Sequence, residues 1–385
     1  MSYVPFPPSR SSPAFIFAIS ATVTTVLPGS VATRTSKAEP PSPLPLRGYL
    51  SPPTTDPLPA CDCDPSVVAA TAATADLDID RAGKLEGAFS PYAEQVLVCT
   101  GKDDWASRVE EDEGADGGGD VLRGFKALFG RGGRFSDPFH NVSFLASSFP
   151  SPGPHPAAYL LPSFTYIPSI DPSQDSLVSL SKSLLLPETL HPMHAILDPE
   201  HRSCLTRAPP SPSSSFSISS IPDPVPVQDV MILICGHGGR DLRCGILGPL
   251  LRLAFRRTLA RTQGISLLDD DSYPQAPSQP SPSSSPSTRV PAEQMTARVG
   301  LISHIGGHKF AGNIIIYVPP HATLPSPSSS SSTGLPHPLA GCSVWYGRVS
   351  PEHAEGIVRE TVLAGNVVRE HFRGGLDAER KLMRI

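Results

Sequence analysis

Two cysteines and two histidines in the C-terminal third of the chain are the residues best suited to chemistry. Cys235 and Cys244 stand in Cys-Gly-His-Gly-Gly-Arg-Asp-Leu-Arg-Cys, and His304 and His308 stand in Ser-His-Ile-Gly-Gly-His-Lys-Phe. Two thiolates and two imidazoles can together hold a zinc ion or an iron–sulfur cluster. The residue types therefore predict a metal centre, and they leave an iron–sulfur cluster, zinc and no metal as open alternatives.

The spacing within each pair also carries information. The interval from Cys235 to Cys244 is longer than the tight cysteine knuckle of structural zinc sites. His304 and His308 would share one face of a helix, but the two glycines between them favour a turn. Backbone N–H groups of that turn, and of the glycines after Cys235, could approach the sulfides of a cluster closely.

Composition limits the class of protein. The 385 residues include 46 prolines, and only 17% of the residues are charged, with a net charge of −5. A charge balance of this kind does not favour a nucleic-acid-binding surface. Seven cysteines at irregular spacing do not form the disulfide framework of a small secreted protein.

Proline- and serine-rich segments divide the chain, because such segments bury too little apolar surface to offset the entropy of ordering. They predict a transit peptide and disordered region at 1–60, an N-terminal α/β lobe at 61–204, a linker at 205–226 and a C-terminal domain at 227–385. Two disordered insertions are predicted within the last domain, at about 272–292 and 319–338.

The N-terminus has the composition of a mitochondrial transit peptide. Its first 38 residues contain no Asp or Glu but do contain Arg10, Arg34 and Lys37. A disordered tail and a secretory signal built on Ala14–Leu27 are the alternatives. The apolar run is interrupted by Ser and Thr and ends at Pro28, so we expect no stable membrane span.

The C-terminal domain has a regular pattern of elements. Val227–Ile234 reads as a strand that ends at Cys235, and a helix follows with Leu247, Leu250, Leu251 and Ala254 on one face and Pro249 in its first turn. Strands are expected at Asn313–Val318 and Ser343–Val349. A final helix is expected to start at Ser350-Pro351, to bury Ala354, Ile357, Val358 and Thr361, and to end at Gly365. This β-α-(ββ)-α order is typical of a thioredoxin-like domain.

A faint internal repeat relates the two lobes. Gln95–Cys99 and Met231–Cys235 are both apolar strands that end in cysteine, and a glycine-containing turn follows each. The N-terminal copy has Arg108 where the second cysteine would fall. The repeat predicts two related α/β lobes, one of which has lost its site.

Several motifs resemble the sucrase/ferredoxin-like family. They are Ile-Cys235-Gly-His-Gly-Gly-Arg-Asp-Leu-Arg-Cys244-Gly, Ser-His304-Ile-Gly-Gly-His308-Lys-Phe-Ala-Gly-Asn, Trp345-Tyr-Gly-Arg-Val, Cys99-Thr-Gly-Lys-Asp-Asp-Trp105 and Gly130-Arg-Gly-Gly-Arg-Phe-Ser-Asp-Pro-Phe-His-Asn-Val142. The resemblance covers both lobes but not the serine–proline insertions.

The resemblance implies a thioredoxin-like ferredoxin fold with a [2Fe–2S] cluster bound by Cys235, Cys244, His304 and His308, outside the Rieske fold. It implies a mitochondrial redox protein, in the matrix or the intermembrane space, that acts in electron transfer or thiol redox quality control. Such a protein would exchange electrons with protein redox partners and would be a carrier more than an enzyme that turns over a substrate. The "sucrase" part of the name finds no support, because no paired carboxylates suggest glycoside hydrolysis.

Two other functions remain open on the residues alone. The chain could be a thiol–disulfide oxidoreductase that uses Cys61, Cys63 or a cluster cysteine, or a structural zinc module that scaffolds partners. His237 is expected to support the site and not to bind the metal. Lys102-Asp-Asp-Trp105 is expected to contact the other lobe or a partner.

Overall fold

The computed structural model describes residues 53–55, 74, 76–112, 117–208, 223–275, 295–324 and 335–385. The predicted transit peptide and disordered region at 1–60 lies outside these residues except for 53–55, where Thr54–Thr55 form a short strand and not disordered chain. Cys61, Cys63 and most of the two predicted insertions also lie outside them. Within the described ranges, no helix combines the length and the apolar character needed to cross a membrane.

The chain is a mixed α/β protein in which the two halves share one order of elements. The N-terminal half contains β2 (Glu94–Cys99), α2 (Gly118–Phe129), β3 (Val142–Ser147), β4 (Ala158–Leu161), β5 (Thr165–Ile167) and α3 (Gln174–Leu180). The C-terminal half contains β7 (Val230–Cys235), α5 (Leu242–Arg261), β9 (Met295–Ile302), β10 (Ile314–Tyr317), β11 (Ser343–Tyr346) and α6 (Ala354–Ile357). The strands run in the order β3-β2-β4-β5 in one half and β9-β7-β10-β11 in the other. In each half one pair of strands is parallel: β2 with β3, and β7 with β9. The next two strands of each half, β4 and β5 or β10 and β11, then join the sheet in antiparallel orientation.

The remaining elements extend this frame. They are β1 (Thr54–Thr55), α4 (Pro199–Leu205), β6 (Val225–Pro226), β8 (Ile265–Leu267), β12 (Val367–Val368) and β13 (Phe372–Leu376). Short 3-10 helices lie at Val109–Glu111, Pro192–Ile196, His308–Phe310, Pro351–His353 and Arg369–His371, and π-helical segments continue α3 at Ser181–Leu185 and α6 at Val358–Leu363. The edge strand β6 pairs with β5, although the sequence places Val225–Pro226 in a linker. The predicted insertion at 319–338 is also narrower, because the Leu324 N–H donates to the Leu335 carbonyl and closes its base.

The two halves join edge to edge at a single antiparallel residue pair, Ser147 and Ile302. The Ser148 N–H donates to the Leu301 carbonyl, and the Ser303 N–H donates to the Ala146 carbonyl, both at 2.9 Å. Each serine hydroxyl also accepts from the opposite strand: Ser303 Oγ from the Ala146 N–H, and Ser148 Oγ from the Leu301 N–H. These reciprocal hydrogen bonds follow a local two-fold axis between the two halves. The junction lies beside the loop that carries His304 and His308, because Ser303 directly precedes His304.

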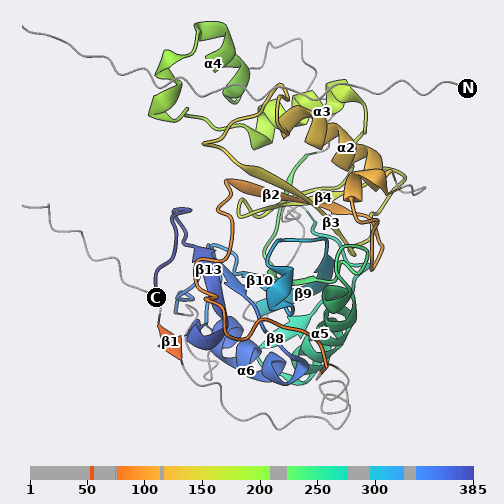
Figure 1. Cartoon of the computed structure of the whole chain (residues 1–385), viewed down its shortest axis with the longest axis vertical. Helices are drawn as coiled ribbons and strands as arrows, with labels where there is room; N and C mark the ends of the chain where they lie inside the picture. Colours follow the sequence, from red (N-terminus) through yellow and green to blue (C-terminus); the bar gives the residue numbers. More distant parts are fainter. Residues whose placement is uncertain are drawn as a thin grey trace, which may run out of the picture. The chain divides into compact units, whose positions relative to one another are not determined.

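Helices cover the outer face of each half, and the two helix-free faces pack against each other. Figure 1 shows α2 and α3 beyond β2–β4, and α5 and α6 beyond β8–β10. Along β7, Ile232 and Ile234 pack with the helices, whereas Leu233 joins a second cluster that contains Leu97 and Tyr317 from the two halves. Tyr317 also donates a 2.6 Å hydrogen bond to Gln95 across that interface. Burial on both faces explains why β7 is apolar at every position and not alternating.

The C-terminal elements largely follow the prediction, with two corrections. The sequence-based order lacked β9, the strand that leads directly to His304. The helix begins at Leu242, so Pro249 lies inside α5 and not in its first turn. The helix starts early because the Asp241 side chain caps it by accepting from the Arg243 N–H at 3.0 Å.

The final helical segment is confirmed. Ser350 is the N-cap with Pro351 at the first position, and the four residues of the predicted apolar face are all buried. Gly365 has φ of +74°, the left-handed conformation that terminates a helix at low cost in glycine.

We expect His353, at the start of this helical segment, to make stability depend on pH. Its Nδ1 accepts from the Ser350 N–H, and burial together with nearby His371 lowers the pKa of His353 from 6.5 to about 4. The folded state thus favours the neutral imidazole, and the unfolded state takes up the proton first as the pH falls. The contribution of His353 to the free energy of unfolding is therefore present above pH 6.5 and is lost as the pH falls toward 4. The loss between pH 7 and pH 5 is about 2 kcal/mol.

Urea unfolding at pH 7 and pH 5 checks this expectation. His353→Gln can keep the cap through its amide oxygen but cannot titrate, so its loss of stability between the two pH values should be smaller by about 2 kcal/mol. Equal losses in the two proteins would contradict the assignment to His353.

Candidate metal centre

Cys235 and Cys244 lie at the junction between β7 and α5. Cys235 ends β7, where its N–H donates to the Asn313 carbonyl at 2.9 Å, and Cys244 lies in the first turn of α5. The helix approaches the strand end closely: a Cβ on Gly248 would lie 2.5 Å from Gly236 Cα, and a Cβ on Gly245 would lie 2.6 Å from Gly238 Cα. Only glycine permits this approach, which brings the two cysteines together.

The two sulfurs form a polarised, buried pair. Both side chains are at most 1% exposed. The thiol of Cys244 donates to Cys235, which holds the pKa of Cys235 well below its ordinary value, and His304 adds to this effect. The same hydrogen bond, together with burial, raises the pKa of Cys244. The lowered pKa of Cys235 favours its thiolate, which is the form that binds metals.

The loop after β9 carries both histidines. Gly306 and Gly307 have φ of +78° and +67°, so the chain turns as the glycines predict and brings the two imidazoles to a ring-centroid separation of 5.2 Å. His304 lies next to Cys235, and His308 is more exposed and lies near Asp241.

One observation indicates that these four side chains suit a metal group. Nδ1 of His304 is buried and has no hydrogen-bond partner among the described residues, although buried polar atoms are nearly always paired. A metal bound at that nitrogen would satisfy it. The structure thus brings Cys235, Cys244 and His304 into contact and places His308 beside His304.

The side chain of His237 supports the loop through both ring nitrogens, and its backbone bonds the Cys235 sulfur. Its Nδ1 accepts from the His304 N–H at 3.1 Å, and its Nε2 donates to the Ala106 carbonyl at 2.8 Å. These two bonds define the neutral tautomer and tie the first histidine of the site to the N-terminal lobe.

Truncation of this histidine should therefore loosen the site. His237→Ala leaves a partly buried N–H and a partly buried carbonyl unpaired, at a cost of about 2 kcal/mol in the free energy of unfolding, and should lower the metal content. His237→Gln, which can accept and donate, is the matched control and should lose less. Urea titration and metal analysis measure both effects, and equal stability of His237→Ala and the wild type would contradict the role.

The glycines after Cys235 serve the contact between the lobes. Gly236, Gly238 and Gly239 donate their N–H groups to Ile302, to Gly236 and to Asp104 respectively, so these groups are already engaged within the protein. A Cβ on Gly239 would lie 2.1 Å from the Trp105 carbonyl oxygen. The backbone of His237, between these glycines, bonds the Cys235 sulfur, and the wrapping of a cluster by this loop stays a prediction.

The motif around Trp105 contacts the other lobe, as one alternative predicted. Asp104 accepts from the Gly239 N–H at 3.1 Å, and Asp103 pairs with Arg252 of α5 at 2.5 Å. Trp105 is buried and contacts His237 edge-on at a centroid distance of 5.9 Å.

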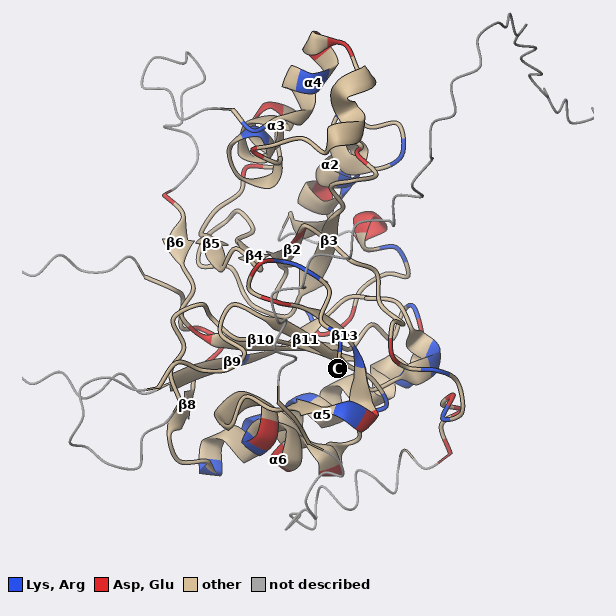
Figure 2. Cartoon of the chain, turned by 90° about the vertical axis from the view of Figure 1, so that its left-hand side faces the viewer, with Lys and Arg blue, Asp and Glu red and all other residues tan. Residues whose placement is uncertain are grey.

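The charged residues after His237 have structural partners. Asp241 and Arg243 form an ion pair at 2.8 Å, and Arg243 holds the pKa of Asp241 below its usual value. Lys309 pairs with Asp80 at 2.9 Å. Arg252 and Arg256 of α5 both pair with Asp270. Figure 2 shows both basic and acidic residues on the segments around α5 and α6.

The equivalent place in the N-terminal lobe offers no second ligand among the described residues. Cys99 ends β2 as Cys235 ends β7, but burial raises the pKa of Cys99 to about 12, with a hydrogen bond to Ser147 as a lesser, opposing effect. The loop after β3 begins Ser148-Phe149-Pro150 and carries no histidine before His155. Cys342 is buried, Cys204 is half-buried, and neither is in a disulfide.

Three further ligand-type side chains come together at His353, Glu370 and His371, with potential ligand atoms within 4.8 Å of one another. The hydrogen bond from the Ser350 N–H to Nδ1 of His353 places the proton of the neutral ring on Nε2. That nitrogen then lacks the lone pair that a metal requires. The cluster is explained by the helix cap.

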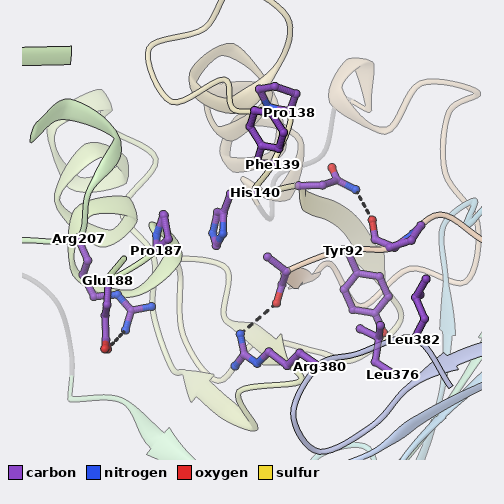
Figure 3. Close-up of a pocket in the computed structure, with 13 residues that line it drawn as sticks. Tyr92, Pro138, Phe139, His140, Pro187, Glu188, Arg207, Leu376, Arg380 and Leu382 are labelled. Carbon is purple, nitrogen blue, oxygen red and sulfur yellow. Dashed lines mark hydrogen bonds and ion pairs between the residues drawn. The ribbon is translucent and has the colours of Figure 1, made fainter. Parts of the chain in front are cut away.

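The pocket drawn in Figure 3 lies away from the cysteines. It has a volume of about 650 Å³ and is lined by residues 91–93, 138–141, 187–188, Arg207, Leu376, Arg380 and Leu382. Arg207 pairs with Glu188 at 3.1 Å, Arg380 donates to the Ala93 carbonyl, and His140 Nε2 bonds the Leu185 carbonyl. Glu188 is the single carboxylate in the lining, so the pocket lacks the carboxylate pair of a glycoside hydrolase.

Sequence comparison places the chain in a family. Residues 85–374 match the sucrase/ferredoxin-like family, and the chain therefore belongs to it. Among curated proteins, the altered inheritance of mitochondria protein 32 of Clavispora lusitaniae is 35% identical over 149 residues, which is 39% of this chain and 36% of that protein. The proteins of the same name from Meyerozyma guilliermondii and Debaryomyces hansenii are 34% and 35% identical over 150 residues, or 38% of this chain and 35% and 37% of theirs. The alignments thus span about a third of the relatives' length. No solved structure matches the chain significantly.

Proposed function

We propose that the protein is a [2Fe–2S] redox protein whose cluster is bound by Cys235, Cys244, His304 and His308. The observation that carries the proposal is the buried, unpartnered Nδ1 of His304 next to the hydrogen-bonded pair of cysteines. Two thiolates and two imidazoles are an established donor set for such clusters, and the family name includes ferredoxin.

The chain's own residues define what the site would do. The hydrogen bond from Cys244 favours the thiolate form of Cys235 by lowering its pKa, His237 orients the backbone of His304, and burial keeps both sulfurs from solvent. When bound, the cluster would accept and release one electron. The more exposed imidazole of His308 gives the centre its closest approach to solvent, and this is where a protein redox partner would dock.

The strand order β9-β7-β10-β11, with a helix between the first two strands of the chain and another after the last, supports a thioredoxin-like fold for the C-terminal half. The N-terminal half repeats this order. We further infer a mitochondrial location from the names of the relatives.

The two rival functions have less support. Thiol–disulfide exchange needs an accessible sulfur, whereas Cys235 and Cys244 are buried. Cys61 and Cys63 lie outside the described residues. A structural zinc site uses the same four donors, so the experiment must separate zinc from iron.

Anaerobic purification followed by metal and sulfide analysis tests the proposal. We expect about two irons and two sulfides per chain, a red-brown absorption spectrum, and an EPR signal that appears on reduction by dithionite. Stoichiometric zinc without iron would refute the cluster and favour the structural zinc module.

A further inference from the structure

A fully buried arginine lies under the candidate metal centre. Arg373, on β13, is 1% exposed. Its guanidinium donates to the Asn313 side-chain oxygen at 2.8 Å, to the Gly306 carbonyl at 3.4 Å and to the Ala88 carbonyl through Nε at 3.1 Å. A Cβ on Gly307 would lie 2.4 Å from its Nη2. The guanidinium thus rests directly against the loop that carries His304 and His308.

The hydrogen-bond partners of this cation are neutral oxygens. Among the described residues, no Asp or Glu lies within ion-pair distance of Arg373, whereas the other buried arginine, Arg298, pairs with Asp229 at 2.6 Å. Burial lowers the pKa of Arg373 to about 10, which leaves it charged at neutral pH, and the nearby Cys235 and Cys244 oppose that shift. Of these two cysteines, Cys235 is the one whose anionic form is favoured, so its sulfur is the anionic partner of the buried charge.

We propose that Arg373 is a positioning residue that stabilises the reduced state of the metal centre and so raises its reduction potential. The inference rests on the proposed [2Fe–2S] function. In an oxidised cluster the doubly positive core is balanced by the two thiolates, and the imidazoles are neutral. One electron from a reduced one-electron carrier turns this neutral centre into an anion and oxidises the carrier by one electron. A fixed cation in a dry site favours the anionic state.

Asn313 connects the charge to the ligands. Its side-chain oxygen accepts from Arg373, its Nδ2 donates to the Gly307 carbonyl at 3.0 Å, and its main-chain carbonyl accepts from the Cys235 N–H. The residues Asn313 and Arg373 therefore hold the histidine loop and the first cysteine in one hydrogen-bonded unit.

The test is a redox titration of the full-length, cluster-loaded protein with dithionite, followed by EPR and visible absorption. In Arg373→Gln, reduction should become at least tenfold less favourable, which is about 59 mV for one electron. Arg373→Lys keeps the charge and should retain most of the wild-type potential. Arg348→Gln is the matched control, since Arg348 donates instead to the carbonyls of Asp80 and Gly83 and lies within 4.0 Å of the Asp80 carboxylate.

Asn313→Asp provides a second variant that keeps the arginine. The substitution places an isosteric carboxylate against the guanidinium, neutralises the positive charge and should also lower the reduction potential. It therefore tests the inference even if Arg373→Gln does not fold. If Arg373→Gln with full iron content, or Asn313→Asp, had the wild-type potential, the inference about Arg373 would be overturned, while the proposed [2Fe–2S] function would stand. Wild-type protein without iron would instead overturn the proposed function itself, together with this inference.

Discussion

Replacement of Cys235 or Cys244 by serine is expected to abolish the visible chromophore and the EPR signal of the reduced protein, with iron falling from about two per chain to near zero. The two sulfurs are in contact and supply all the thiolate charge of the site. A serine hydroxyl stays protonated at neutral pH and is a poor donor for iron that already has only two thiolates. The loss should therefore be complete in each single variant.

The internal repeat supplies the matched control for these variants. Cys99 occupies in β2 the position that Cys235 occupies in β7, and it is equally buried. Cys99→Ser should therefore lower the free energy of unfolding to a similar extent, but the protein should keep its iron and its colour. A coloured Cys235→Ser protein, or loss of iron from Cys99→Ser at unchanged stability, would show that the ligands are assigned incorrectly.

Gly248→Val should have the largest effect on folding among changes outside the four ligands. A Cβ at this position would lie 2.5 Å from Gly236 Cα and 3.0 Å from the Cys235 carbonyl oxygen, and both are backbone atoms that cannot move aside. The variant must push α5 away from the end of β7, which separates the two cysteines. We expect a loss of about 3 kcal/mol in the free energy of unfolding and a parallel loss of iron.

Gly153→Val is the control for this change, because a Cβ at Gly153 meets no atom within 4 Å. Urea unfolding and iron analysis of both variants give the comparison. If Gly248→Val retained wild-type stability and iron, the close packing of α5 on the strand end would not be needed for the site.

The arrangement of β9 explains why the sequence identified the ligands but not how they meet. Cys235 and Ile302 are paired neighbours on parallel strands, so the loops that follow them emerge at the same edge of the sheet. The sequence did not reveal β9, because Gly300 interrupts its pattern. That glycine is required by the other lobe, since a Cβ there would lie 2.5 Å from Phe149 Cζ. A contact between residues far apart in the chain therefore hid the strand from local reasoning.

The amino-acid sequence by itself determined the residue types of the site, the turn between the two histidines, the strand that ends at Cys235 and the buried face of the last helix. These features depend on local chemistry: ligand identity, glycine at positive φ and apolar periodicity. Only the tertiary structure decided that Asp104 and Trp105 pack against the glycines after Cys235, and that the guanidinium of Arg373 lies buried against the histidine loop. Such contacts arise from how the two halves pack, and packing between distant segments leaves no periodic pattern in the chain.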